Sequence, residues 1–161
     1  MTPSKFQLLT AALLVALPGW SAADSKPRGA QPASYEKIAT AYAGKTELWG
    51  DNCNGGIYFA PNWQARAWCA DTSENFGAGR WSVEPGGLVC HDLTWYWPNG
   101  ARAGASPGGK TCVSHVVDRW GKLWRNWPGS AEWWPLDGSG ALVRGYKLQQ
   151  QVQQTQRRLG M

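Results

Sequence analysis

The chain has 161 residues, 12 of them tryptophan, and its 16 lysine and arginine residues against 11 aspartate and glutamate residues give a formal net charge of +5. The positive residues are scattered, Arg157 and Arg158 being the only adjacent pair, and no nucleic-acid-binding motif is present. The composition therefore argues against a nucleic-acid partner and indicates one small domain rich in indole side chains.

The amino end has the three parts of a secretory signal peptide. Lys5 precedes an apolar run over residues 6–17, and the small residues at 21–23 suit a signal peptidase. A membrane-spanning helix needs roughly 20 apolar residues, and this run is shorter. We therefore expect a signal peptide over residues 1–23 with cleavage after Ala23, a periplasmic or secreted protein, and no transmembrane segment in the mature chain.

A flexible leader and a short helix are expected next. Residues 24–33 are polar and contain two prolines and a glycine, which predicts a flexible leader. Ser34 can cap a helix over residues 35–43, because its hydroxyl can accept a hydrogen bond from a free amide of the first turn. Gly44 ends that helix, since glycine adopts the left-handed conformation cheaply.

From residue 45 the pattern changes to short strands separated by turns rich in glycine, proline and asparagine. The expected strands cover residues 46–49, 57–60, 65–69, 80–83, 88–97, 112–117 and 122–127, with a candidate last strand at 133–136 and a glycine-rich excursion at 98–109. This pattern predicts a mainly β domain over residues 34–136, a small antiparallel barrel or sandwich of about 7–8 strands. Residues 137–161 are rich in glutamine and predict a flexible or partly helical tail.

Four cysteines, Cys53, Cys69, Cys90 and Cys112, are an even number in a chain expected to be exported, which favours two disulfides. A zinc site is the alternative, but the spacings match no usual ligand pattern. Three pairings are possible. The pairs Cys53–Cys69 and Cys90–Cys112 are favoured, because each joins successive hairpin-like segments. No metal and no cofactor are expected.

Five short motifs occur in one order along the mature chain. They are Ala43-Gly44-Lys45-Thr46, Gly56-Ile57-Tyr58-Phe59-Ala60-Pro61, Gly79-Arg80-Trp81-Ser82-Val83, Leu88-Val89-Cys90 and Thr111-Cys112. In this series the chain resembles the proteobacterial exported family known as domain of unknown function 995, over roughly residues 34–127. The resemblance implies a small periplasmic or secreted β protein with a Cys90–Cys112 bridge. It brings no established activity and no catalytic residues.

Aromatic residues are the most informative candidates for a site. The run Trp95-Tyr96-Trp97 places large rings on both faces of one strand, so some of them are expected to be exposed. Indoles mostly pack in cores, but exposed aromatic patches often mark binding surfaces. The candidate ligand-binding residues are Trp95, Trp97, Trp120 and Trp124, with Arg119 and Arg125 at the rim.

An enzyme is the less favoured interpretation. His91 and Asp92 are adjacent on a strand and point to opposite faces, so they cannot orient each other. A glycosidase-like pair, Glu84 with Asp92, has nothing in the sequence that brings it together. We expect a non-catalytic monomer that binds a small molecule, a glycan or an exported protein through its aromatic surface. The alternatives are a protein–protein role, such as an inhibitor of a secreted hydrolase or a cell-envelope factor, and a small hydrolase.

Overall fold

The computed structural model describes residues 25–50, 53–70, 74–100, 102–136 and 142–161, so the expected signal peptide lies outside the described residues. Its strands are β1 (Gln31–Pro32), β2 (Lys45–Trp49), β3 (Gly55–Phe59), β4 (Gln64–Cys69), β5 (Asn75–Glu84), β6 (Leu88–Asn99), β7 (Arg102–Val117), β8 (Leu123–Asn126), β9 (Trp134–Pro135) and β10 (Leu142–Arg144). The helices are α1 (Tyr35–Tyr42) and α2 (Gln149–Arg158).

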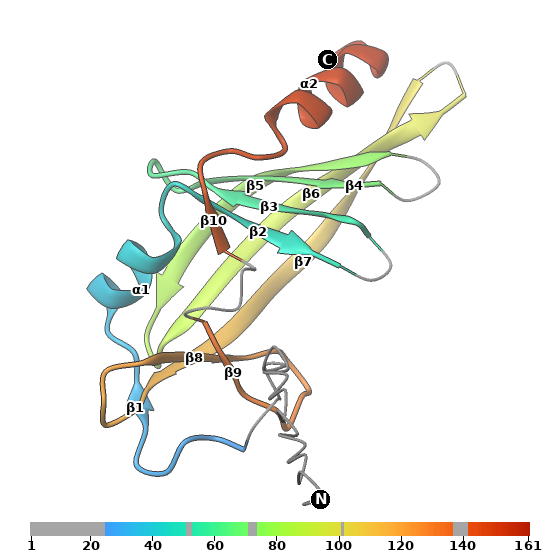
Figure 1. Ribbon diagram of the computed structural model, residues 1–161. Coiled ribbons are helices and arrows are strands. Elements are labelled where there is room, and N and C mark those ends of the chain that lie inside the picture. The colour runs from blue at the N-terminus through green and yellow to red at the C-terminus, as the bar shows by residue number, and fades with distance from the viewer. Residues whose placement is uncertain (1–24, 51–52, 71–73, 101, 137–141) are drawn as a thin grey trace, which may run out of the picture.

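Within the described residues, the strands form one antiparallel sheet in the order β10-β2-β3-β4-β5-β6-β7-β8-β9, and β1 pairs with β7 (Figure 1). From β2 to β9, consecutive strands are neighbours because short connections join them. The turn between β5 and β6 contains Gly86 and Gly87 with φ of 84° and 79°, a conformation that glycine adopts without a steric penalty. The mainly β, antiparallel fold expected from the sequence is confirmed.

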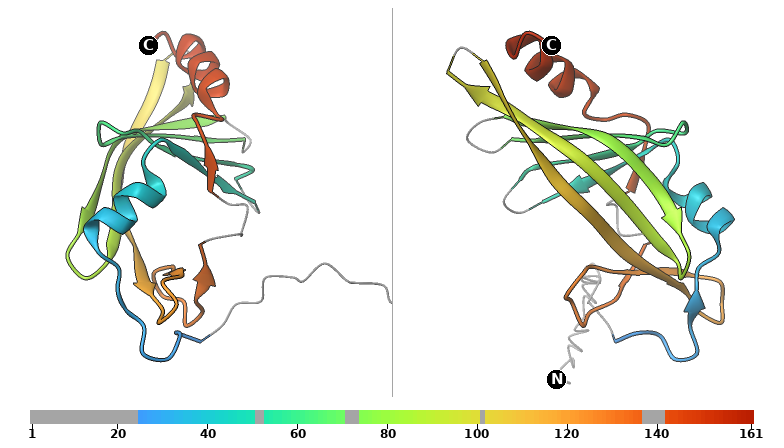
Figure 2. Two further views of the ribbon diagram at one scale, coloured as in Figure 1. Left: turned by 60° about the vertical axis from the view of Figure 1, so that its left-hand side comes forward. Right: turned by 180° about the vertical axis from the view of Figure 1, so that it is seen from behind.

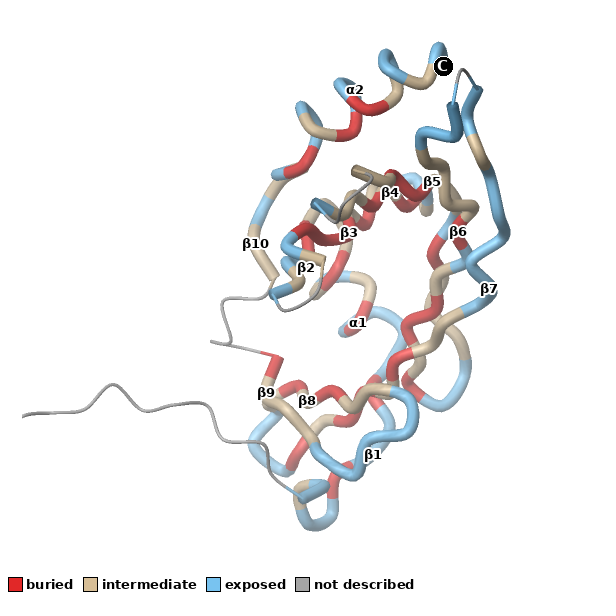
Figure 3. Tube along the Cα trace, turned by 90° about the vertical axis from the view of Figure 1, so that its right-hand side faces the viewer, coloured by how far each residue is buried: buried red, intermediate tan, exposed pale blue. Residues whose placement is uncertain are grey.

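The sheet curls into a half-barrel, and its core lies on the concave side (Figures 2 and 3). Strand residues alternate between the two faces, so every second side chain of β3, β4 and β5 points inward. The core residues are Ala33, Ile38, Tyr42, Ile57, Phe59, Ala65, Ala67, Trp81, Val89, Leu93, Leu123 and Leu136. Helix α1 lies on the concave side, where the Tyr42 ring contacts Phe59 at a centroid distance of 4.9 Å.

The start of the chain agrees with the expected helix but not with a wholly flexible leader. Ser34 caps α1, accepting a hydrogen bond from the Lys37 amide at 3.3 Å. Before it, β1 at the end of the predicted leader pairs with Val116 and Val117 of β7. Part of the leader is therefore tied to the sheet, because the end of β7 offers free backbone groups beside it.

The glycine-rich excursion predicted over residues 98–109 is wrong. The β6–β7 hairpin continues through it, with pairing from Leu88 and Ser114 out to Asn99 and Arg102. The hairpin projects as the long yellow element of Figure 1. Glycine often marks a loop, but in β7 it makes room for tryptophan rings of β6, as described below.

The glutamine-rich tail is helical where residues 149–158 form α2, and this helix is packed rather than loose. Val152 and Thr155 are buried, and the Trp68 indole on β4 donates a hydrogen bond to the Thr155 hydroxyl at 3.2 Å. Arg158 forms an ion pair with Glu74. The sequence of α2 does not predict that the helix packs on the domain, because two buried side chains make too weak an apolar pattern. No helix among the described residues is long and apolar enough to cross a membrane.

Both predicted disulfides are confirmed. Cys53 is bonded to Cys69, and Cys90 to Cys112. Cys90 and Cys112 are direct cross-strand partners on β6 and β7, with a Cα–Cα distance of 4.0 Å. Cys53 lies just before β3, and Cys69 ends its neighbour β4, so both bridges link segments that lie side by side in the sheet.

Candidate functional site

The turn between β7 and β8 is built around one carboxylate. Asp118 Oδ1 accepts hydrogen bonds from the backbone amides of Trp120 and Lys122, both at 2.9 Å. Its other oxygen accepts from the Trp124 indole N–H at 3.0 Å. Burial alone would raise the pKa of Asp118, but these three hydrogen bonds and the Lys122 charge outweigh it and lower the pKa. Asp118 therefore stays ionised and shapes the turn.

Because the turn is held in this way, Trp120 is directed to solvent. Its side chain is 75% exposed, the largest fraction among the exposed large hydrophobic residues that the structure describes. The guanidinium carbon of Arg119 lies 4.1 Å from the Trp120 ring centroid, a cation–π contact. The ring therefore has a defined orientation and a positive charge on its surface, although little protein covers it.

The beginning of the described chain lies against this turn. Lys26 and Arg28 line a cleft of about 520 Å³ together with Arg119, Trp120 and Trp124. We call it the cationic cleft. Its charged lining residues are three cations and Asp118, whose oxygens already serve the turn. Lys122, over the Trp124 ring at 5.1 Å from the centroid, adds a further positive charge nearby. The cleft therefore attracts negative charge.

Three of the residues predicted from the sequence, Arg119, Trp120 and Trp124, meet in this cleft. Lys26 and Arg28 were missed, because the sequence does not show where the leader passes over the domain. Their spacing around Pro27 places two cations close together, which was the available signal.

Arg125 was expected at a rim, and this prediction is wrong. Its side chain is buried and forms an ion pair with Glu47 of β2. Beside this pair the Tyr42 hydroxyl lies 2.7 Å from His115 Nε2. Tyr42, Glu47, His115 and Arg125 form what we call the interior polar cluster. Strand alternation places Arg125 and Leu123 on the inward face of β8, where a charge needs a partner.

Burial controls the protonation of the interior polar cluster. It raises the pKa of Glu47, while the charge and hydrogen bond of Arg125 act in the opposite direction. It lowers the pKa of His115 to about 4, so the imidazole is neutral at neutral pH. The Nδ1 of His115 lies 3.0 Å from the Val113 carbonyl oxygen and donates to it, which leaves Nε2 to accept from Tyr42.

Trp95 and Trp97 do not join the cationic cleft. They pair with Ser106 and Gly104 near the start of β7, whereas Trp124 pairs with Val116 near its end. Twelve residues of strand separate Gly104 from Val116, roughly 40 Å at the usual rise per residue. Both rings are half-buried. The candidate residues therefore divide into a cleft, a buried ion pair and two rings that pack on a strand.

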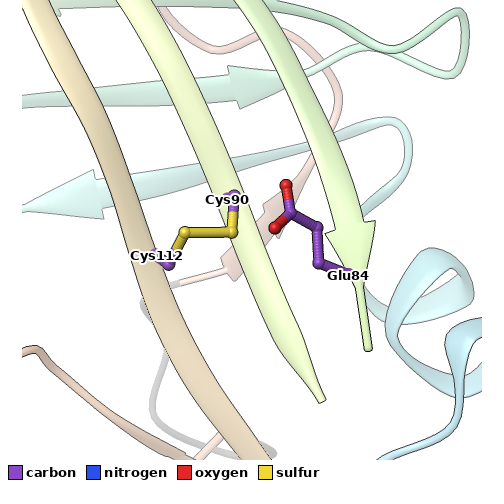
Figure 4. Close-up of side chains that lie close together, drawn as sticks. All are labelled: Glu84, Cys90 and Cys112. Atoms are coloured by element: carbon purple, nitrogen blue, oxygen red, sulfur yellow. A yellow bond between two sulfur atoms is a disulfide. The ribbon is translucent and has the colours of Figure 1, made fainter. Parts of the chain in front are cut away.

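One further grouping contains ligand-type side chains. The carboxylate of Glu84 lies beside the Cys90–Cys112 disulfide (Figure 4). Because both sulfurs are bonded to each other, they cannot act as thiolate ligands, and the group does not form a metal site. Glu84 instead contacts Lys110 Nζ at 2.6 Å and accepts from the Ser82 hydroxyl at 3.1 Å.

Comparison with known proteins gives a family but no activity. The model of a family described as a protein of unknown function, DUF995, matches residues 10–141. The chain therefore belongs to the DUF995 family, as the motif series predicted. No curated protein and no solved structure gave a significant match to the chain.

Proposed function

We propose that this member of the DUF995 family is an exported, non-catalytic binding protein that takes an anionic ligand in the cationic cleft. The observation that carries the proposal is Trp120, three-quarters exposed, with Arg119 on its face and Lys26 and Arg28 lining the same cleft. Export rests on the signal-peptide pattern of residues 1–23.

An exposed indole that is held in place is suited to binding. Exposing so large an apolar ring to water is unfavourable, and the ring contributes nothing to the core cluster. Asp118 meanwhile uses three hydrogen bonds to fix the turn that presents it. Fixing the ring before binding reduces the entropy lost when a ligand covers it.

The ligand chemistry follows from the lining. Guanidinium and ammonium groups bind phosphate or carboxylate through charge-assisted hydrogen bonds, and the indole face packs against a flat, partly apolar surface. We therefore expect a ligand that carries negative charge next to such a surface. An acidic saccharide and an anionic lipid headgroup share this chemistry, and the experiment separates them.

The test uses the purified mature chain and two probes. Isothermal titration with oligogalacturonate tests a soluble acidic saccharide, and flotation with phosphatidylglycerol-containing vesicles tests a lipid headgroup. We expect one probe to bind, and Trp120→Ala to weaken it about tenfold or more. Raising the salt concentration should weaken binding further, because the cations of the cleft are exposed and screened.

Arg102→Ala is the matched control, because it removes an exposed arginine near the far end of β7. This variant should bind as the unchanged chain does. Binding of neither probe, or equal binding by the Trp120→Ala and unchanged proteins, would overturn the proposal. Vesicles of phosphatidylcholine alone show whether any lipid binding depends on charge.

A further inference from the structure

A tryptophan occupies a backbone position normally reserved for glycine. Trp63 closes the turn between β3 and β4 with φ of 66°, the left-handed region that bulky side chains rarely adopt. Its amide donates to the Ala60 carbonyl and its carbonyl accepts from the Trp81 amide, both at 3.0 Å. These bonds require the turn, but they do not require an indole, since glycine would satisfy them without strain.

The unusual position places the Trp63 ring in a row of three aromatic side chains. Its centroid lies 4.5 Å from that of Trp81 and 5.9 Å from that of Tyr35. Trp81 is buried and donates its indole N–H to the Ala60 carbonyl at 2.8 Å. Tyr35, at the start of α1, is 51% exposed. The row, which we call the aromatic wall, therefore runs from the core to the surface.

The three residues of the aromatic wall line a pocket of about 440 Å³ together with Arg80, Glu84, Asp92 and Lys110. We call it the outer pocket. Arg80, Asp92 and Lys110 are direct cross-strand partners on β5, β6 and β7, so their side chains share one face of the sheet. Glu84 joins this row through its ion pair with Lys110. Pockets of this volume commonly hold small ligands.

The outer pocket differs from the cationic cleft in its charge. Arg80 and Lys110 balance Glu84 and Asp92, so these four residues have no net charge. They offer both hydrogen-bond donors and acceptors at the surface. A ligand with many hydroxyl groups, each able to donate and accept, matches such a lining. A charged ligand would instead be repelled by the two side chains that carry the same charge.

We infer that the outer pocket binds a neutral saccharide, whose apolar ring face packs on Trp63 and Tyr35 while its hydroxyls bond to Arg80, Asp92 and Lys110. The C–H face of a pyranose ring is flat and slightly positive, which suits the negative face of an aromatic ring. This site is separate from the cleft of the proposed function, because it involves α1, the β3–β4 turn and β5 rather than the β7–β8 turn.

The test is a calorimetric titration of the full mature chain with three neutral probes, maltotetraose, cellotetraose and chitotetraose. We expect at least one to bind. Trp63→Gly should weaken it about tenfold or more, because it removes the ring while placing the residue best suited to φ of 66° in the turn. Trp63→Phe keeps an aromatic ring and should bind within about threefold of the unchanged chain.

Two further variants keep the result interpretable. Tyr35→Ala removes an exposed ring, so it tests the wall even where Trp63→Gly fails to fold. Trp120→Ala alters only the cationic cleft and should leave saccharide binding unchanged, so failure of one site is distinguished from failure of the other. The inference is overturned if none of the three probes binds, or if a probe binds equally to the unchanged, Trp63→Gly and Tyr35→Ala proteins.

Discussion

His115 is a titratable residue held in the interior of the protein. It is fully buried on β7, and both ring nitrogens already have partners in the Val113 carbonyl and the Tyr42 hydroxyl. Arg125 nearby further disfavours a second positive charge. Protonation of the ring would therefore break a hydrogen bond and place an uncompensated charge in the interior.

The stability of the protein should consequently fall in mild acid. Because burial lowers the pKa of His115 to about 4 from 6.5, the unfolded chain binds a proton between these values and the folded chain does not. The free energy of unfolding then decreases as the pH falls through this window, by up to about 3 kcal/mol, and is constant for this group above it. Urea unfolding at a series of pH values measures this slope.

His115→Gln, which keeps an acceptor for Tyr42, should flatten the slope. His91, whose pKa is also lowered by burial with Asp92 opposing, contributes with the same sign, so His91→Gln measures the part of the slope that belongs to the second histidine. Glu47 faces the same cluster, and its raised pKa contributes with the opposite sign. An unchanged slope in His115→Gln would show that His115 is not the group responsible.

At the scale of one element, β7 shows why a glycine-rich segment forms a strand. A Cβ atom on Gly104 would lie 2.6 Å from the Trp97 ring, and one on Gly108 would lie 2.7 Å from Trp95. The rings of β6 therefore lie across the bare backbone of β7, and they cover apolar area that the glycines themselves cannot supply. This packing compensates for the low strand propensity of glycine.

Gly104→Ala tests this arrangement. The added methyl group forces the Trp97 ring to move, so we expect a loss of stability of about 1–3 kcal/mol and a red shift of tryptophan emission as the ring becomes more exposed. Ala105→Ser, at the neighbouring exposed position, is the control and should change neither. If Gly104→Ala melts and emits like the unchanged protein, the ring does not depend on the glycine.

At the scale of the whole molecule, side chains hold together the two ends of the curled sheet. β2 and β8 stand next to opposite edge strands, β10 and β9, and Glu47 of β2 bonds to Arg125 of β8 across the interior. Among the described residues, Arg125 Nε has no hydrogen-bond partner. The ion pair between Glu47 and Arg125 therefore leaves one buried donor of Arg125 without an acceptor. We expect loss of the ion pair to destabilise both edges of the sheet.

Replacing one partner should be more harmful than replacing both. Glu47→Leu leaves a buried, unpaired arginine and should cost about 3–5 kcal/mol, whereas adding Arg125→Met to it should recover much of this loss. Denaturant unfolding of the two single variants and the double variant forms the cycle. Hydrogen exchange in the double variant, which should remain folded, reports whether β10 and β9 open more often.

If the loss of stability in the double variant, measured from the unchanged chain, equalled the sum of the two single losses, the two side chains would act independently. The half-barrel would then be held by its hydrogen-bond ladder alone. Lys110→Ala, which removes the exposed partner of Glu84, is a control for loss of a surface ion pair and should change the stability far less than loss of the buried pair.

By itself, the sequence determined the local and covalent features of this protein. The alternation of apolar residues and the turns at glycine and proline predicted an antiparallel β domain. Ser34 predicted the start of α1, and four cysteines with their spacing predicted Cys53–Cys69 and Cys90–Cys112. Each of these follows from residues close together in the chain, or from a count, and needs no knowledge of which distant segments meet.

Only the tertiary structure decided which residues form sites. The packing of Lys26 and Arg28 beside Trp120, the burial of Arg125 against Glu47, and the docking of α2 on Trp68 all join segments far apart in sequence. A charge at the surface and a charge in the interior have the same sequence signal. What separates them is the inward or outward direction of a strand residue and the partner that the curl of the sheet brings to it.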